Sequence, residues 1–344
     1  MSAPSVRTIA ETCGLSNATV SRALAGHPSV RPATREQVAT VAKRLGYTRN
    51  HLIGTLMSQL RLSRAATFHG NLALIHVPSA GQPLLLPTHR RIIAGARTRA
   101  GELGFKLDLH TLGGDGLKIR RLVQILRARN TTGLIFIYAD PNTVTTDFPW
   151  NEFTSVEIDY GEREPRITTV CIDHFDTVMG ALNRLHALGY RRMGMFLERF
   201  KDDRLWYRFS SVYHSFHVHT TSATPLPTCV VERMNADSFF AWYRRHKPDL
   251  VIGHVDEAVE WLRSAGVRVP ETTAFFSLNW TARKRPCAGF DILPELQGIV
   301  AVESVIAQVH RHERGLPDHP RTIMIRGRWV DGPTLTRKPL ASPH

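Results

Sequence analysis

Apolar side chains recur at helical spacing in three short stretches of the first 48 residues. The first stretch ends at Gly14, the second follows Ser16, whose hydroxyl can cap a helix, and Pro32 opens the third. The faces expected to be buried consist of Val6, Ile9 and Ala10, then Val20 and Leu24, and then Val38, Val41, Ala42 and Leu45. Two short helices joined by a tight turn, with a third packed across them, form a helix-turn-helix module. The pattern therefore predicts a small all-α head.

From about residue 68 onward, continuous apolar runs alternate with amphipathic stretches. The run at 72–77 is typical of a buried parallel strand, and a helical pattern follows at 90–104. Further strands are expected at 105–109, 133–137, 156–158, 193–197, 228–231, 250–253 and 273–277, and further helices at 119–129, 176–188, 203–217, 236–246 and 256–265. This alternation predicts a doubly wound α/β body. Because about 275 residues are many for one such sheet, two similar lobes are expected.

The charge of the chain is unevenly distributed. Its 344 residues are 42% hydrophobic, as in ordinary globular proteins, and carry a formal net charge of +14. Residues 1–66 account for +7, which is half of that charge. A basic head on a more neutral body favours a polyanionic partner, either nucleic acid or an anionic membrane surface. Because the head has the apolar periodicity of a folded unit, we expect a nucleic-acid-binding module rather than a basic tail.

Several protein classes are disfavoured by the sequence. No apolar run reaches the roughly 18–20 residues of a membrane span, and residues 1–25 contain no apolar segment of signal-peptide length. The four cysteines are far apart, which excludes a Cys-based zinc motif and argues against a disulfide framework. His-Glu-x-x-His, Gly-x-x-x-x-Gly-Lys-Ser/Thr and Gly-x-Ser-x-Gly motifs are all absent. We therefore expect a cytoplasmic protein without a membrane partner, metal, cofactor or enzymatic activity.

The second helix of the head, from Asn17 to Ala25, is the one expected to enter the major groove of DNA. Asn17, Ala18 and Arg22 are not needed for the core, so we expect them to contact base edges. Ser29 is a further candidate for a base contact. The short hydroxyl side chains expected to bind phosphates are Ser16, Thr19, Ser21 and Thr34. The alternatives are a solvated surface charge for Arg22 and a helix-start residue without a readout role for Asn17.

The head contains an ordered set of small, polar and basic residues: Ala10, Gly14, Ser16, Thr19, Val20, Ser21 and Arg22. With the continuation through 34–36 to 45–47, this pattern resembles the head of the lactose-repressor (LacI/GalR) family of transcription regulators. The resemblance implies a sequence-specific DNA-binding regulator, most simply a repressor, that binds a pseudo-palindromic operator as a homodimer. It also implies that the dimer forms through the body, chiefly by first-lobe helices such as 90–103.

The segment after the head resembles the hinge of the same family. The resemblance implies that this hinge becomes helical on operator DNA and that a leucine from each subunit enters the minor groove. Asn50 and Leu56 lie at the matching positions, so Leu56 is the expected wedge. Arg49, Ile53 and Gly54 depart from the family pattern, and Gly54 costs about 1 kcal/mol of helix propensity relative to alanine. The alternative is that Leu56 packs in a helix–helix contact between subunits.

The body resembles periplasmic sugar-binding proteins through the same family, with matching pieces that include 188–194 and 329–335. In that fold the chain crosses between two lobes three times, here expected near 172–176, 286–292 and 325–330. The expected organisation is a head at 1–48, a hinge and linker at 49–67, and a body at 68–344 with lobe 1 at about 68–174 plus 290–326, lobe 2 at about 175–289 plus 327–335, and a tail at 336–344.

Family members bind a small-molecule effector, often a sugar, between the lobes at the carboxyl ends of the strands. By rough position, the resemblance assigns this role to Asp159, Arg208, Asp256 and Trp280. Trp206 is an alternative to Trp280 for stacking on a sugar ring. The match is loose, because His254 and Val255 precede Asp256 where the family has an Asn-Asp pair. Each residue has the alternative of being packed or solvated without a ligand.

Two other functions remain open at this point. An architectural DNA-binding protein without an effector agrees with the loose match of the pocket and with the high overall charge. A sugar-binding protein without a regulatory role agrees with the body, but the intact head argues against it.

Overall fold

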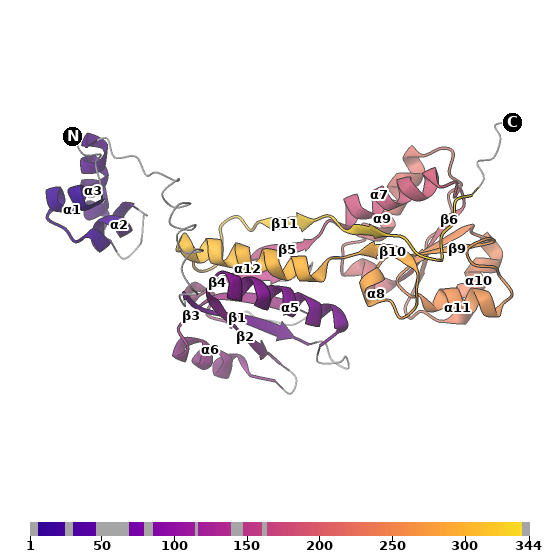
Figure 1. Ribbon diagram of the computed structural model, residues 1–344, viewed down its shortest axis with the longest axis horizontal. Helices are drawn as coiled ribbons and strands as arrows, with labels where there is room; N and C mark the ends of the chain where they lie inside the picture. Colours follow the sequence, from indigo (N-terminus) through magenta and orange to yellow (C-terminus); the bar gives the residue numbers. More distant parts are fainter. Residues whose placement is uncertain are drawn as a thin grey trace.

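The computed structural model describes residues 6–24, 30–45, 69–78, 85–113, 116–138, 147–159 and 164–338. In chain order these residues form a helical head and a body of two lobes, each of which is a sheet covered by helices (Figure 1). The predicted fold class, an all-α head followed by a two-lobed doubly wound α/β body, is confirmed.

Three helices make up the head: α1 (Val6–Cys13), α2 (Asn17–Leu24) and α3 (Pro32–Arg44). Gly14 ends α1 with a φ of 67°, a conformation that glycine adopts without a steric penalty. The buried core consists of Ile9, Ala10, Val20, Ala23, Val30, Val38 and Ala42. Leu24, Val41 and Leu45 are half-buried against it. The predicted apolar faces therefore point inward wherever their side chains are described.

Lobe 1 contains a parallel sheet with the strand order β11–β5–β4–β3–β1–β2. Its strands are β1 (Gly70–Val77), β2 (Phe105–Thr111), β3 (Thr131–Tyr138), β4 (Thr154–Ile158), β5 (Thr168–Ile172) and β11 (Thr322–Ile325). In the register of the sheet, Leu72 of β1 lies opposite Leu107 of β2 and Gly133 of β3. The central strands are apolar on both faces because helices cover both sides of the sheet.

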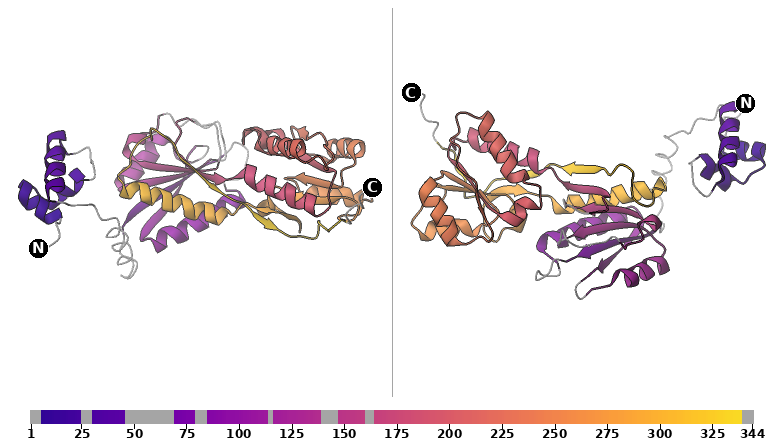
Figure 2. Two further views of the ribbon diagram at one scale, coloured as in Figure 1. Left: turned by 90° about the horizontal axis from the view of Figure 1, so that it is seen from above. Right: turned by 180° about the vertical axis from the view of Figure 1, so that it is seen from behind.

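Helices α5 (Pro87–Glu102) and α12 (Pro294–His310) lie side by side on one face of this sheet, and α6 (Ile119–Ala128) covers the other (Figures 1 and 2). The backbones of α5 and α12 meet at two glycines. A Cβ on Gly95 would lie 2.1 Å from the carbonyl oxygen of Glu295, and one on Gly298 would lie 2.1 Å from that of Ile92. No side chain larger than hydrogen fits at these two positions.

Lobe 2 has a sheet with the order β12–β10–β9–β8–β6–β7, in which β12 runs antiparallel to β10. Its strands are β6 (Met193–Glu198), β7 (Cys229–Val231), β8 (Leu250–Gly253), β9 (Ala274–Ser277), β10 (Ala288–Asp291) and β12 (Arg328–Val330). Its helices are α7 (His174–Ala187) and α9 (Arg208–His219) on one face, and α10 (Ala236–His246) and α11 (Glu257–Ser264) on the other. The apolar pattern of the sequence does not predict β5, β10, β11 or β12.

The single helix expected at 203–217 is a wrong prediction, because two helices separated by a turn take its place. Helix α8 (Arg199–Asp203) ends before the turn, where residues 206 and 207 have φ values of 56° and 57°. The buried carboxylate of Asp202 accepts two backbone N–H groups in the first turn of α9, at 3.2 and 3.3 Å. This carboxylate satisfies N–H groups that a helix start leaves without partners, which favours a new helix at this point.

The chain passes between the lobes after β5, after β10 and between β11 and β12. Strand β11 forms one edge of the lobe 1 sheet, and β12 forms one edge of the lobe 2 sheet directly afterwards. The segment after β12 stays with lobe 2. The buried hydroxyl of Thr334 donates to the carbonyl oxygen of Phe275 at 2.7 Å and accepts the N–H of Ala288 at 2.9 Å. Both lobes are therefore completed by the C-terminal part of the chain.

Candidate functional site

The second helix of the head begins at a hydroxyl cap. The Ser16 Oγ accepts the backbone N–H of Thr19 at 3.1 Å, and the two side-chain oxygens lie 2.8 Å apart. This bond satisfies one of the N–H groups that the first helical turn leaves without a partner. Ser16 is exposed and Thr19 is half-buried. Both residues are thus at the N-terminus of α2, where the helix dipole favours an anion such as phosphate.

Arg22 lies on the outer side of α2. Val20 and Ala23 of the same helix are buried in the head core, whereas the Arg22 side chain is exposed. Because the guanidinium is not used for packing, it can form a bidentate contact with a base in a DNA groove. The geometry of the head is therefore compatible with the role predicted for Arg22.

Other residues predicted to contact DNA are described in part or not at all. Thr34 is half-buried in the first turn of α3. The residues outside the described part are Ser29, Asn50 and Leu56, and only the backbone is described for Asn17, Ala18 and Ser21. Helical spacing nevertheless places positions 18 and 22 on one face of α2. The roles of these residues stay predictions.

A cavity of about 310 Å³ lies between the two lobes. It lies at the carboxyl ends of parallel strands, where the loops diverge and leave space for a ligand. Its lining consists of Leu86, Pro87, Thr88, His89, Ile92, Ile137, Ile158, Asp159, Ile172, His174, Phe200, Lys201, Arg204, Leu205, Phe209, His254, Leu278, Asn279, Ala282, Ile292 and Gln297. We call this space the interlobe cavity.

An ion pair in the interlobe cavity joins the two lobes. Asp159 directly follows β4 of lobe 1 and has a φ of 79°, which aspartate tolerates better than most residues. Arg204 directly follows α8 of lobe 2, and its guanidinium donates to the Asp159 carboxylate. Both side chains are partly buried. Because one partner belongs to each lobe, the pair bridges the two lobes beside the cavity.

Three histidine side chains line the interlobe cavity. His89 belongs to α5 of lobe 1, His174 is the first residue of α7, and His254 directly follows β8. The Nε2 of His76 lies 3.1 Å from the Nδ1 of His89. The rings of His174 and His254 each approach the ring of Phe209 edge-on, with centroid distances of 5.2 and 4.9 Å.

Burial keeps these imidazoles neutral at neutral pH. It lowers the pKa of His174 to about 4. Burial also holds the pKa of His254 well below its ordinary value, and the nearby Lys201 lowers it further. Burial lowers the pKa of His89, although the Asp159 carboxylate has the opposite effect. Each neutral ring offers one hydrogen-bond donor and one acceptor.

Of the four effector contacts predicted from the sequence, Asp159 lines the interlobe cavity, whereas Arg208, Asp256 and Trp280 do not. Arg208 lines a smaller pocket of about 230 Å³ beside β5 and β11. Asp256 is buried, and its carboxylate accepts the backbone N–H groups of residues 284 and 285 at 2.9 and 2.6 Å. Asp256 therefore holds a loop in place. The structure does not bring the four predicted residues together.

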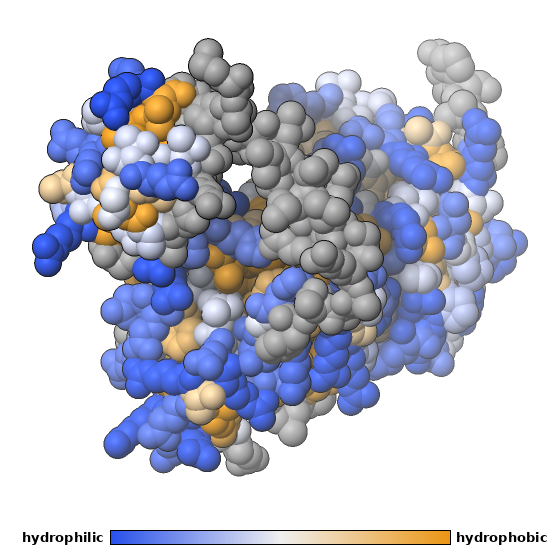
Figure 3. Space-filling model, turned by 60° about the vertical axis from the view of Figure 1, so that its left-hand side comes forward, coloured by the Kyte–Doolittle hydropathy of each residue, from blue (hydrophilic) through white to orange (hydrophobic). Residues whose placement is uncertain are grey.

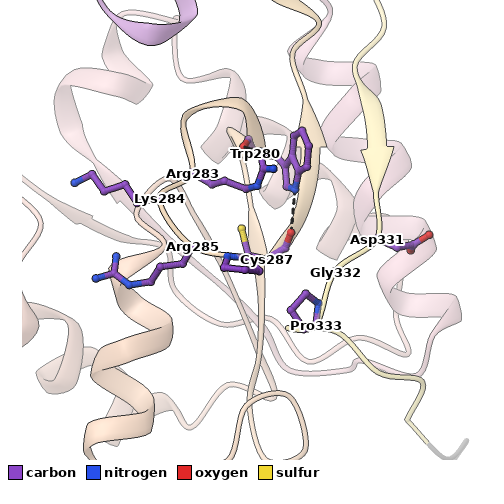
Figure 4. A pocket seen from close by; sticks show the side chains of 9 residues that line it. Trp280, Arg283, Lys284, Arg285, Cys287, Asp331, Gly332 and Pro333 are labelled. Carbon is purple, nitrogen blue, oxygen red and sulfur yellow. Dashed lines mark hydrogen bonds between the residues drawn. The ribbon is translucent and has the colours of Figure 1, made fainter.

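Trp280 belongs to a separate pocket of about 420 Å³ on lobe 2, shown in Figure 4. Its indole N–H donates to the carbonyl oxygen of Cys287 at 3.0 Å, and the Arg283 guanidinium lies 3.3 Å from the ring centre. The arginine thus occupies a ring face on which a sugar could have stacked. The ring of Trp206 is likewise approached by a guanidinium, that of Arg166, at 5.5 Å.

The cavity residues that sequence analysis missed are His89, His174, His254, Lys201 and Arg204. A signal existed for His254, since it directly follows a predicted buried strand and the ends of parallel strands meet at one edge of a sheet. Arg204 had no comparable signal, because it lies in the turn that interrupts the expected helix. Motif spacing also does not reveal the three histidines, because they come from distant parts of the chain.

Two further observations concern only the described part of the chain. None of the helices in that part of the chain is long and apolar enough to cross a membrane. Among the same residues, no three His, Cys, Asp or Glu side chains are placed to hold a metal ion. The face of the molecule in Figure 3 is mostly hydrophilic, with scattered apolar residues. The cavity imidazoles are candidates for hydrogen bonding to a ligand because they line the interlobe cavity.

Comparisons with known proteins relate the chain to bacterial regulators. Residues 5–50 match the family model described as bacterial regulatory proteins, lacI family. The HTH-type transcriptional regulator CelR of Thermobifida fusca is 28% identical over 193 residues, covering 55% of this chain and 54% of that protein. The lactose operon repressor of Escherichia coli (strain K12) is 25% identical over 190 residues, covering 54% and 49%. The chain thus matches about half the length of these curated relatives.

Solved structures share the fold over nearly the whole chain. A complex of the transcriptional regulator CelR with cellobiose has a TM-score of 0.57 at 21% identity and covers 96% of this chain and 99% of its own. A lac repressor dimer bound to operator and the anti-inducer ONPF has a TM-score of 0.55 at 18% identity, with coverages of 97% and 99%. At these identities the likeness establishes the fold.

A helix-turn-helix head followed by a two-lobed α/β body is the architecture of the class of transcriptional regulators to which these relatives belong. Within that class the head belongs to the LacI family of bacterial regulatory proteins. The resemblance to this family, predicted from the pattern between Ala10 and Arg22 and its continuation to residue 47, is confirmed.

Proposed function

We propose that this protein is a cytoplasmic transcriptional repressor that binds a pseudo-palindromic operator as a homodimer and responds to a small molecule in the interlobe cavity. The head is the observation that carries the proposal. Its family motif folds into three helices packed on one core, with Ser16 at the start of α2 and Arg22 exposed on it. In this proposal residues 1–48 read DNA, and 49–67 form the hinge that carries Asn50 and the Leu56 wedge.

The dimer of this proposal forms through lobe 1, chiefly by α5. The buried side of α5 already packs against the sheet and α12. Its outer side carries the exposed residues Arg90, Ala94, Arg97 and Thr98, which are accessible to a second copy. The lac repressor structure of the same fold is a dimer on its operator. Two heads related by a two-fold axis would read two half-sites of opposite orientation.

The regulatory step of this proposal is a shift between two lobe arrangements. The walls of the interlobe cavity come from both lobes, and the Asp159–Arg204 pair spans them. A ligand that binds one arrangement more tightly shifts the equilibrium by its difference in affinity, and the dimer transmits that shift to the heads. Cellobiose in the structure of the relative CelR makes sugars the first class of effector to test.

The proposal is tested by selecting random duplex DNA with the purified protein at near-physiological salt. Enrichment of a two-fold symmetric site is the expected outcome. The Arg22→Ala variant should then lose about 1–3 kcal/mol of affinity for the selected site, with a much smaller loss on random DNA. Arg120→Ala, which removes an exposed arginine of α6 in the body, serves as the matched control and should bind like the parent chain. Unchanged site affinity in the Arg22 variant would contradict its base contact.

A second candidate function is an architectural DNA-binding protein without an effector. The observation in its favour is that three of the four predicted effector residues lie outside the interlobe cavity. This function predicts no enriched site in the selection and binding that disappears as salt rises, because only phosphate contacts would hold the complex together.

A further inference from the structure

Two imidazoles of the interlobe cavity have no hydrogen-bond partner among the residues that the structure describes. The Nδ1 atoms of His174 and His254 are buried without one, and neither ring bonds to any group in the described part of the chain. His174 is 8% exposed, and both rings line the cavity. Buried polar groups in proteins are nearly always paired, because an unpaired one has lost its hydration without compensation. Two such groups on one cavity mark a place where a bound molecule supplies the partner.

The two imidazoles are held in fixed positions. Phe209 of α9 contacts both of them, and each imidazole meets its ring edge-on. Phe209 itself is 1% exposed, so its ring is fixed by the core of lobe 2. A pair of donors and acceptors that is positioned before the ligand arrives binds with less loss of side-chain entropy.

His174 also lies where a bound ligand could influence the connections between the lobes. It begins α7 immediately after the first crossing between the lobes. The preceding residue, Asp173, donates its N–H to the carbonyl oxygen of Ile325 at 2.9 Å and caps α7 by accepting the N–H of Asp176 at 3.0 Å. Ile325 ends β11, directly before the third crossing. A ligand bonded to His174 therefore acts on two of the three crossings through one residue.

Each charged side chain that lines the cavity has an ionic partner. The carboxylate of Asp159 binds the guanidinium of Arg204, and Lys201 lies 3.1 Å from the carboxylate of Glu198. An anionic ligand would have to compete with Asp159, and a cationic one would face Lys201 and Arg204. Aliphatic side chains such as Ile137, Ile158 and Ile292 supply much of the remaining wall. These features favour an uncharged molecule with an apolar face.

We propose that His174 and His254 are the residues that recognise the ligand of the interlobe cavity, and that this ligand is an uncharged, hydroxyl-bearing ring. The proposal rests on the proposed function, in which the cavity receives the effector. It assigns specificity to two neutral imidazoles, each of which donates one hydrogen bond and accepts another from vicinal hydroxyl groups.

The test measures ligand binding to the full chain by calorimetry and by the shift of the thermal midpoint. The probes are a panel of uncharged mono- and disaccharides, including glucose and cellobiose, beside gluconate, glucose 6-phosphate and glucosamine. We expect an uncharged sugar to bind and its charged counterparts to bind at least tenfold more weakly. His254→Leu should lower the affinity for that sugar by about tenfold, which corresponds to the loss of one well-formed hydrogen bond. His254→Asn should restore part of that affinity.

Matched controls separate this proposal from its alternatives. His214→Leu, which replaces an exposed histidine of α9, should bind sugar like the parent chain. Tighter binding of a charged probe, full affinity in His254→Leu, or binding by none of the uncharged sugars would overturn the proposal. Loss of sugar binding in Arg283→Ala alone would place the ligand in the pocket of Figure 4 and would also overturn it. The DNA selection is independent of all these outcomes, so the proposed regulator can survive the failure of this assignment.

Discussion

The head and the interlobe cavity are both candidate binding regions, but the head is built from one short stretch of sequence and the cavity from distant parts of the chain. The described core of the head and its expected base and phosphate contacts fall within residues 9–42, and several of these contacts are on one helix. The cavity draws on residues from Leu86 to Gln297 and on both lobes. The first region needs only helical spacing and three packed helices, whereas the second exists after two sheets and three crossings are in place.

This difference means that the two regions can be disturbed separately. A change in the head core should affect DNA binding and leave the body intact. A change in the lobes should affect body stability and ligand binding while the head still reads DNA. Each prediction below tests one side of that separation.

The largest effect is expected from Ile9→Ala in the head. Ile9 is fully buried, and its truncation should cost about 2–5 kcal/mol, which is comparable to the whole stability of a domain this small. Operator binding should be lost and the head should become sensitive to protease, while the thermal midpoint of the body stays unchanged. Thr40→Ala, at an exposed position of α3, is the control and should retain binding. A variant at Ile9 with full operator affinity would show that the head is supported from outside itself.

A slightly smaller loss of stability is expected from a substitution where α5 contacts α12. Gly95→Ala would put a Cβ 2.1 Å from a backbone oxygen that cannot rotate away, so the lobes should lose about 3 kcal/mol in urea unfolding. Gly101→Ala in the same helix is the matched control. A Cβ there has no neighbour within 4 Å, so alanine should stabilise by up to about 1 kcal/mol. Equal effects of the two substitutions would contradict the close approach of α5 and α12. Binding to random DNA should be unchanged in both.

The smallest of the three effects concerns pH. His174 has a pKa of about 4 when folded, below the ordinary value of 6.5, so between these values the unfolded chain binds a proton that the folded chain does not. The contribution of the neutral His174 to the free energy of unfolding is fully present above pH 6.5 and is lost as the pH falls toward 4. From pH 8 to pH 5 this loss should be about 2 kcal/mol. The pKa of His76, also lowered to about 4, acts with the same sign.

Urea unfolding at pH 8 and pH 5 measures the contribution of His174. In His174→Gln the fall in stability between the two pH values should be smaller than in the parent chain by that amount. His214→Gln, on the exposed side of α9, should leave the fall unchanged. An identical pH dependence in the parent chain and in His174→Gln would show that His174 is not buried in the folded state.

Sequence reasoning predicted the fold well where local signals were strong. The helices of the head follow from Gly14, Ser16 and Pro32, which mark their ends. Apart from β5, the strands up to β9 coincide with apolar or alternating runs bounded by polar residues, so the sequence shows them without any tertiary information. Strands β10, β11 and β12 have three or four residues, and two of them form sheet edges. Segments this short acquire their strand conformation from pairing, which the local sequence does not show.

The candidate site of the body was predicted less well, for a physical reason. Arg208 and Asp256 are close in sequence to the cavity residues Phe209 and His254. Their own side chains nevertheless do not line the cavity, because local turns and hydrogen bonds direct them elsewhere. The interruption before α9 brings Arg204 to Asp159, and the backbone N–H groups of residues 284 and 285 bind the carboxylate of Asp256. Both outcomes depend on hydrogen bonds to distant backbone groups, which have no signature in residue spacing.

The strands β11 and β12 follow one another in the chain, and one completes each sheet. During synthesis, a ribosome that has released residues up to 321 has therefore delivered the whole head but a finished sheet for neither lobe. The head can fold early, whereas the lobes close together once the last strands emerge. If the proposed function holds, a premature stop shortly before β11 would leave a basic head able to bind a half-site but without a completed body for dimerisation or for the response to a ligand. Folding of both lobes consequently depends on the segment that contains β11 and β12.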